Sequence, residues 1–201
     1  MSVLITARGL AIGYDGRVIA TVPDLDIRRG DRVSIAGANG SGKTTLLKTL
    51  GRLLAPVSGT LSGVDAGPSG AVYVHPSPFL YAGTGHDNVR LGARGNAGDI
   101  ERAIVALRAR DFARMNVREM SNGQRQRIAL ARALAACPAL LLIDEADSGL
   151  DADGRAAWNE VVTTRHDLAI VRVSHVATTE LEREGDGVVV QVSTGKSGKH
   201  G

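Results

Sequence analysis

A glycine-rich loop between an apolar segment and a helical segment constrains the fold of this chain more than any other feature. Residues 32–36 are mostly apolar, and the loop that follows reads Gly37-Ala38-Asn39-Gly40-Ser41-Gly42-Lys43-Thr44. In this pattern, backbone N–H groups wrap a polyphosphate, which requires the conformational freedom of glycine. Residues 43–54 are expected to form a helix whose N-terminal partial positive charge favours an anion. A strand, this loop and a helix in succession predict an α/β fold that binds phosphates. Lys43 is expected to reach the β- and γ-phosphates of a nucleotide, and the Thr44 hydroxyl to bind Mg²⁺.

Two adjacent carboxylates follow a second apolar segment. Residues 140–143 are Leu-Leu-Leu-Ile, and Asp144 and Glu145 come next. Such a segment is typical of a parallel strand buried on both faces. Parallel sheets bind ligands at the carboxyl ends of their strands. Asp144 is therefore expected to hold Mg²⁺, directly or through water, and Glu145 to act as the general base that orients the attacking water.

A third candidate is Ser121-Asn122-Gly123-Gln124, at the start of an expected helix. Ser121 as the cap and Gln124 three residues later form a capping box, which accounts for the helix start by itself. The same helix N-terminus is also suited to bind an anion. The structural and the functional interpretations are compatible.

Composition excludes several classes of protein. Of the 201 residues, 43% are apolar and 22% charged, which is typical of a folded globular chain and argues against disorder or a coiled coil. Only 3% are aromatic and the net charge is +3 without a basic stripe, so nucleic acid is not expected as a partner. Cys137 is the single cysteine and is expected to be buried and inert. The longest apolar stretch, residues 133–143, is too short to cross a bilayer and is interrupted by Pro138, so we expect a soluble chain. The N-terminus lacks a basic segment followed by an apolar stretch and a small-residue cleavage site, so no signal peptide is expected.

Strand and helix patterns alternate at both ends of the chain, with a helical stretch between them. This order predicts a parallel α/β sheet with a small helical lobe. We expect one domain, with a nucleotide-binding core of residues 1–75 and 138–192, a helical lobe of residues 76–137 and a flexible tail of residues 193–201. Expected strands cover residues 3–10, 18–27, 32–36, 71–74, 140–143, 168–173 and 187–192. Expected helices cover residues 43–54, 100–110, 122–136 and 153–164, with shorter helices after Pro76.

These motifs, in this order, resemble the nucleotide-binding subunit of ABC transporters across roughly residues 3–192. Residues 37–45 match the phosphate loop, and residues 121–124 match the family signature, which continues into RQRIALARAL. Residues 140–145 match the second nucleotide motif, and residues 148–151 match a loop at the dimer interface. The resemblance implies a P-loop NTPase fold with a parallel RecA-like core, an antiparallel β subdomain and a short helical lobe.

The resemblance also implies roles for individual residues. Lys43, Glu145 and His175 would be catalytic, with His175 the switch histidine at the γ-phosphate, and Tyr14 would stack on adenine. Thr44 and Asp144 would hold Mg²⁺, with His75 as a further candidate ligand. The implied ATP contacts within one chain are Tyr14, Gly37, Asn39, Gly40, Ser41, Gly42, Lys43, Thr44 and Thr45. The contacts implied from a second copy are Ser121, Gly123, Gln124 and Asp151.

Four features depart from the family pattern. His75 stands where the family has a glutamine, and imidazole is a poorer ligand than an amide oxygen for Mg²⁺. Asn122 replaces the first glycine of the signature pair, and asparagine tolerates unusual backbone angles. Ala146 replaces a proline and is followed by Asp147, which adds a negative charge. The lobe of residues 76–120 is short for the family. Because Lys43, Asp144, Glu145 and His175 are all present, we expect a complete ATPase.

The implied activity is ATP hydrolysis that powers substrate transport, through two cassettes that close on ATP and open after hydrolysis. The expected cofactors are ATP and Mg²⁺. The expected partners are an integral membrane subunit and a second cassette, with the chain peripheral on the inner, cytoplasmic face of the membrane. Two alternatives remain open at this stage. One is a soluble ATPase of the same superfamily that is not coupled to transport, and the other is a module that binds nucleotide without turnover.

Overall fold

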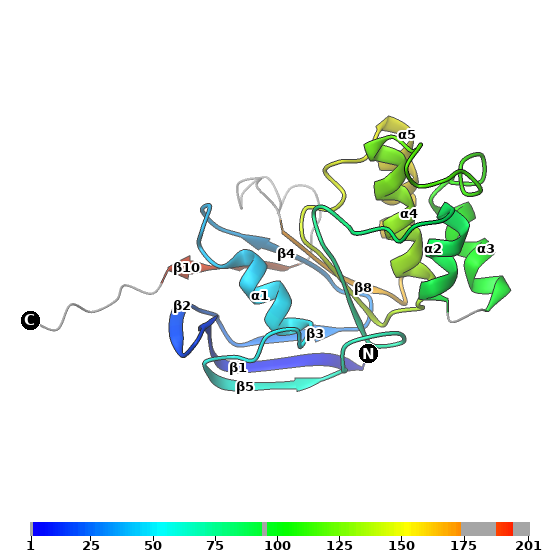
Figure 1. Ribbon diagram of the computed structural model, residues 1–201. Helices are drawn as coiled ribbons and strands as arrows, with labels where there is room; N and C mark the ends of the chain where they lie inside the picture. The colour runs from blue at the N-terminus through cyan, green and yellow to red at the C-terminus, as the bar shows by residue number, and fades with distance from the viewer. Residues whose placement is uncertain (1, 94–95, 174–187, 195–201) are drawn as a thin grey trace, which may run out of the picture.

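The computed structural model describes residues 2–93, 96–173 and 188–194, which form two five-stranded β-sheets and five α-helices (Figure 1). The strands are β1 (Val3–Tyr14), β2 (Arg17–Thr21), β3 (Leu25–Arg28), β4 (Arg32–Ala36), β5 (Ser58–Gly63), β6 (Ala71–Val74), β7 (Leu140–Ile143), β8 (Ala169–Val173), β9 (Val188–Gln191) and β10 (Ser193–Thr194). The helices are α1 (Lys43–Leu50), α2 (Gly85–Gly92), α3 (Ala97–Ala106), α4 (Asn122–Ala135) and α5 (Ala152–Thr164).

One sheet is parallel throughout, with strand order β6-β7-β8-β4-β9. Its strand β7 is completely buried, as its four apolar residues predict. Leu140 and Leu142 pack into the core on one face of the sheet, whereas Leu141 and Ile143 pack into the core on the other. A strand buried on both faces places the residues that follow it, Asp144 and Glu145, at the carboxyl edge of the sheet.

The second sheet is antiparallel and is built around the long strand β1, which pairs with β2, β3 and β5, while β10 pairs with β2. Helix α1 lies between the two sheets (Figure 1), and its Leu46, Leu47 and Leu50 are fully buried in the core that both sheets share. A parallel core, an antiparallel sheet and helices confirm the predicted fold class.

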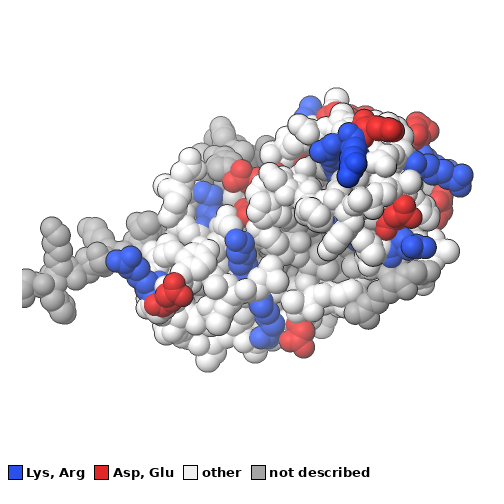
Figure 2. All heavy atoms as spheres, viewed as in Figure 1, with Lys and Arg blue, Asp and Glu red and all other residues white. Residues whose placement is uncertain are grey.

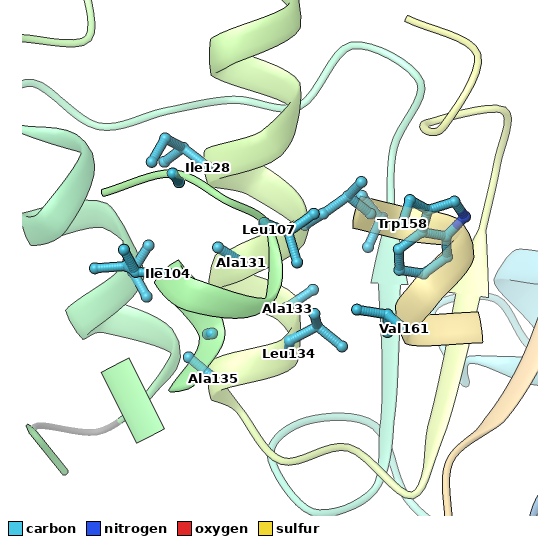
Figure 3. Packing of buried hydrophobic residues seen from close by; sticks show 14 of the residues in the cluster. Ile104, Leu107, Ile128, Ala131, Ala133, Leu134, Ala135, Trp158 and Val161 are labelled. Atoms are coloured by element: carbon cyan, nitrogen blue, oxygen red, sulfur yellow. The ribbon is translucent and has the colours of Figure 1, made fainter. Parts of the chain in front are cut away.

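The other face of the parallel sheet packs against α4 and α5, and α2 and α3 extend this layer. Figure 3 shows this second core, where Ile128 and Leu134 of α4 lie near Leu107 at the end of α3, and Trp158 and Val161 come from α5. The core is made chiefly of Leu, Ile, Val and Ala side chains, as the low aromatic content predicts. It fixes the position of α4 and therefore of its N-terminus.

The observed strands differ from the expected ones in two places. The single strand expected over residues 18–27 is divided into β2 and β3, because the chain leaves the sheet around Pro23. Strand β5 was not predicted, since its sequence SGTLSG is mostly exposed and has no apolar alternation. Backbone pairing with β1 forms it instead, and a Cβ at Gly63 would lie 2.0 Å from the carbonyl oxygen of Leu4, so glycine is required at this close approach.

Three further predictions were wrong in detail. Helix α1 ends at Leu50 rather than residue 54, because Gly51 caps it and Arg52 adopts a left-handed φ of 55°. Cys137 is exposed rather than buried, since it lies just beyond α4 with a φ of 48°. The predicted tail begins too early, because Ser193–Thr194 pairs with β2 as strand β10.

Candidate functional site

The glycine loop connects β4 to α1 and depends on three left-handed glycines. Gly37, Gly40 and Gly42 have φ values of 155°, 77° and 103°, which L side chains adopt only with strain. A Cβ at Gly37 would also lie 2.6 Å from Oγ of Ser41 and 2.8 Å from the carbonyl oxygen of Val192. These glycines therefore allow the backbone to adopt the concave loop that the motif predicts.

The loop is electrostatically prepared for an anion. Gly42 caps α1 without a side-chain hydrogen bond, and no acidic residue lies in the first turn, so the helix N-terminus keeps its partial positive charge. Lys43 Nζ turns back over the loop and donates to the carbonyl oxygens of Gly37 at 2.8 Å and Ala38 at 3.0 Å. The Ser41 hydroxyl is buried and has no hydrogen-bond partner among the described residues. Buried polar groups normally have partners, so this hydroxyl indicates a place for a ligand oxygen.

Asp144 meets the loop from the end of β7. The carboxylate is almost completely buried, and Oδ1 accepts a hydrogen bond from Oγ1 of Thr44 at 3.2 Å. The phenol of Tyr73 donates to Oδ2 at 2.7 Å. Burial, together with this carboxylate, raises the pKa of Tyr73 far above its usual value, which keeps the phenol protonated as a donor. Thr44 of the glycine loop and Asp144, each predicted to bind Mg²⁺, are thus in direct contact.

Glu145 adopts a left-handed φ of 57°, which is uncommon for a residue with a side chain. Its carbonyl oxygen accepts hydrogen bonds from the backbone N–H of Ser148 at 3.0 Å and from the Ser148 hydroxyl at 2.7 Å, and these bonds hold the turn. A proline after Glu145 would restrict its backbone toward extended conformations. Ala146 imposes no such restriction. Alanine in place of the family's proline is therefore compatible with the left-handed conformation of Glu145, the expected general base.

Tyr14 ends strand β1 at the rim of the same loop. Its ring is partly exposed, and its hydroxyl lies 3.3 Å from Oγ1 of Thr45. An exposed aromatic face beside the phosphate loop is suited to stacking on a base. The structure therefore brings Tyr14, Lys43, Thr44, Thr45 and Asp144 together.

Ser121 and Gln124 form the predicted capping box at the start of α4. The Gln124 backbone N–H donates to Oγ of Ser121 at 3.2 Å, and the Ser121 backbone N–H donates to Oε1 of Gln124 at 2.9 Å. Gly123 lies against Asp151, because a Cβ there would be 3.4 Å from Cγ of that aspartate. These four residues, predicted to contact ATP from a second copy, gather at the N-terminus of α4 and of α5, away from α1 (Figure 1).

Asp151 has structural contacts as well. It caps α5 by accepting from the Gly154 backbone N–H at 2.8 Å, and it pairs with Arg127 of α4. Burial acts to raise the pKa of Asp151, but the bonds from Arg127 and Gly154 hold it below its usual range. Arg127 also pairs with Asp153 at 2.6 Å and lies over the Phe112 ring, 5.6 Å from its centroid. One arginine thereby joins α4 to the residues at the start of α5.

Replacement of Arg127 by methionine tests this connection. We expect Arg127→Met to lower the free energy of unfolding by about 2 kcal/mol, because the arginine is buried and its partners lose their donors. The aspartate pKa values are depressed in the folded state, so the stabilisation is present above pH 4 and the difference from wild type shrinks as the pH falls through the folded-state values. Urea unfolding of both proteins at pH 7 and at pH 3 measures this difference in the free energy of unfolding. The exposed Arg114→Met is the control, and an equal effect of both substitutions would contradict the role of Arg127.

The remaining predicted residues are Asn39, His75 and His175. Asn39 is exposed in the glycine loop. His75 is exposed just beyond β6, its Nδ1 accepts from the Ser77 backbone N–H at 3.0 Å, and its ring packs edge to face on Tyr73. His175 lies outside the described residues, so its role stays a prediction.

Sequence reasoning missed Tyr73, Arg127 and Gln126. The amide of buried Gln126 donates to the carbonyl oxygens of Pro76, at 3.2 Å, and Ala146. It thus joins α4 to the segments after His75 and after Glu145. Its position on the apolar side of α4 could have indicated this role, because a buried polar side chain needs hydrogen-bond partners.

A groove of about 510 Å³ lies between the core and the helical lobe, lined by β6 and by residues of α2 and α4. Its lining includes Leu53, Phe79 and Leu91, which are 57%, 70% and 56% exposed. On the face in Figure 2, basic and acidic side chains are interspersed, with both signs gathered over the helical lobe. No helix in the described part of the chain is long and apolar enough to span a membrane.

The glycine loop, its lysine and the buried carboxylate at the end of β7 define a nucleoside-triphosphate-binding domain of the P-loop class. A family model described as ABC transporter matches residues 21–148. The zinc import ATP-binding protein ZnuC of Photorhabdus laumondii is 33% identical over 87% of this chain and 70% of its own length. The aliphatic sulfonates import ATP-binding protein SsuB 2 of Nocardia farcinica is 39% identical over 86% of this chain and 73% of its own length.

A solved structure described as an ATP-binding subunit of an ABC transporter superposes with a TM-score of 0.81 at 25% identity, covering 96% of this chain and 89% of that one. The chain belongs to the ABC transporter family. It is an ATP-binding subunit, an ATPase that powers transport together with a membrane partner. This confirms the class of function predicted from the motifs.

Proposed function

We propose that this subunit binds ATP with Mg²⁺ at the glycine loop and hydrolyses it at an interface between two cassettes. The observation that carries the proposal is the hydrogen bond between Thr44 and Asp144, which joins the phosphate loop to the end of β7. The loop amides, the α1 N-terminus and Lys43 bind the β- and γ-phosphates, and Tyr14 stacks on the adenine. Lys43 exchanges its carbonyl partners, Gly37 and Ala38, for phosphate oxygens when ATP is bound.

Thr44 and Asp144 fit a magnesium ion. Their hydroxyl and carboxylate oxygens lie 3.2 Å apart, and oxygen ligands of this kind are those that Mg²⁺ prefers. The ion would supply charge neutralisation at the β- and γ-phosphates. Glu145, the neighbour of Asp144, accepts a proton from the attacking water and directs its oxygen at the γ-phosphorus. His175 is proposed to contact the γ-phosphate.

The second cassette supplies the signature residues. Within the described residues, no hydrogen bond or ion pair joins Ser121, Gly123, Gln124 or Asp151 to the glycine loop, so these residues are proposed to contact ATP bound to the partner cassette. The Ser121 hydroxyl accepts from Gln124 and keeps its own proton for a phosphate oxygen. ATP favours the closed dimer only through the contacts that it makes there, so loss of the γ-phosphate opens it.

The membrane partner is proposed to dock in the groove beside the helical lobe. Exposed Leu53, Phe79 and Leu91 at this groove support the proposal, because grouped exposed apolar side chains mark interaction surfaces. The subunit would then lie on the inner, cytoplasmic face of the membrane. The relatives named above belong to import systems, which supports inward transport here.

Two experiments separate this function from its alternatives. Co-expression with a polytopic membrane subunit, followed by purification in detergent, should recover a complex, whereas a soluble ATPase would purify alone. In proteoliposomes that contain the complex, phosphate release from Mg-ATP should exceed that of the Glu145→Gln complex. A module that only binds nucleotide would show no difference between the two.

The substitution His75→Gln tests the position where the family has glutamine. We expect ATPase activity to stay equal or to rise by up to about tenfold, because an amide oxygen is the better partner for Mg²⁺. Phosphate release at saturating ATP measures it, with the exposed His166→Gln as a matched control. A severe loss of activity would instead give His75 a role that glutamine cannot perform.

A further inference from the structure

The phenol of Tyr73 occupies a defined place beside the proposed magnesium site. Tyr73 lies on β6 and is the register partner of Leu142 on β7, two residues before Asp144. Since side chains alternate along a strand, Tyr73 and Leu142 face the same side of the sheet, where α1 begins with Lys43 and Thr44. The hydrogen bond from Tyr73 to Oδ2 of Asp144 therefore crosses from one strand end to the next.

Both oxygens of Asp144 are held by this chain. Oδ1 accepts from Thr44 at 3.2 Å and Oδ2 accepts from Tyr73 at 2.7 Å, while the backbone N–H of Asp144 donates to the carbonyl oxygen of Val74 at 3.0 Å. A carboxylate with a donor on each oxygen and a fixed backbone keeps one orientation. The Oδ1 oxygen then stays beside Thr44, where the ion is proposed to bind.

The Tyr73 ring is itself restrained. It packs against the core shared by the two sheets, and its edge contact with His75 has a centroid distance of 6.3 Å and an interplanar angle of 74°. A ring held on two sides directs its hydroxyl with little freedom. Groups that hydrogen-bond to metal ligands in this way orient them and affect metal affinity.

We propose that Tyr73 is a positioning residue for Asp144, whose phenol holds the carboxylate in the orientation that binds Mg²⁺. This inference rests on the proposed role of Asp144 as the magnesium ligand. Tyr73 is proposed to act through Asp144, to which its phenol donates. Its ring also lines the groove proposed for the membrane partner, so the residue that holds the metal carboxylate borders the docking surface.

The test measures binding of a fluorescent ATP analogue at graded Mg²⁺ concentrations and in EDTA. We expect Tyr73→Phe to raise the half-saturating Mg²⁺ concentration by about tenfold, while binding in EDTA is unchanged. Tyr73→Leu should behave like Tyr73→Phe, because the phenol and not the ring is responsible. The double variant Tyr73→Phe/Asp144→Asn should match Asp144→Asn alone, since residues that act through one another are not additive.

The control is Thr163→Val, which removes a hydroxyl from the exposed face of α5. Thermal unfolding of each variant separates a loss of fold from a loss of metal affinity. If the wild type shows magnesium-dependent binding and Tyr73→Phe shifts it by less than about twofold, or strengthens it, the role of Tyr73 is overturned and the proposed function stands. If nucleotide binding by the wild type does not depend on Mg²⁺, both proposals fail.

Discussion

Substitution of Lys43 by alanine is expected to abolish ATP binding at millimolar nucleotide. The ammonium group lies over the glycine loop, on the carbonyl oxygens of Gly37 and Ala38, and would pair with the β- and γ-phosphates instead. Charge-assisted hydrogen bonds of this kind contribute about 1.5–3 kcal/mol each. Loss of two of them weakens binding by at least about 100-fold.

Equilibrium binding of ATP, measured by calorimetry, checks this expectation. Lys48→Ala is the matched control, because it removes the same charge from the last turn of α1. We expect the control to bind ATP like the wild type, and both variants should keep the wild-type circular dichroism spectrum. Unchanged affinity in a folded Lys43→Ala protein would refute the assignment of the loop.

Substitution of Glu145 by glutamine should leave ATP binding intact and lower turnover by about 1,000-fold. General base catalysis contributes about 10²–10⁴ in rate, and glutamine keeps the size of the side chain but cannot accept the proton. Because the γ-phosphate then persists, ATP-bound dimers should accumulate. Phosphate release measures the first effect, and size-exclusion chromatography with light scattering measures the second.

The control for this substitution is Asp147→Asn. It removes a carboxylate two residues away without touching the proposed base, so turnover should stay within about threefold of the wild type. A Glu145→Gln protein that hydrolyses ATP at the normal rate would exclude Glu145 as the base. One that binds no ATP would indicate that the left-handed turn at this residue depends on the carboxylate.

The predictions that succeeded rest on strong local signals. The glycine loop and the apolar run of β7 each restrict the backbone strongly. A few residues are therefore enough to predict where the loop and the buried strand lie in the fold. The capping box at Ser121 is equally local. Because parallel strands end at one edge, the meeting of Thr44 and Asp144 could be expected from these pieces alone.

The features that were missed depend on contacts distant in sequence. Strand β5 is polar and forms by pairing with β1, which no periodicity in its own six residues reveals. Tyr73 meets Asp144 through a hydrogen bond across 71 positions, and Arg127 meets Asp151 across 24. Their residue types gave no local pattern, so only the assembled sheet and lobe identify them.

The amide of Gln126 has a consequence for how the lobe can rotate. Its two hydrogens go to carbonyl oxygens in separate segments, one after His75 and one after Glu145. A rotation of α4 that preserved one bond and broke the other would leave a buried polar atom without a hydrogen-bond partner, at a cost of about 1–3 kcal/mol. Independent displacement of the two segments is therefore penalised, and a motion that moves the segment after His75 and the segment after Glu145 together costs less.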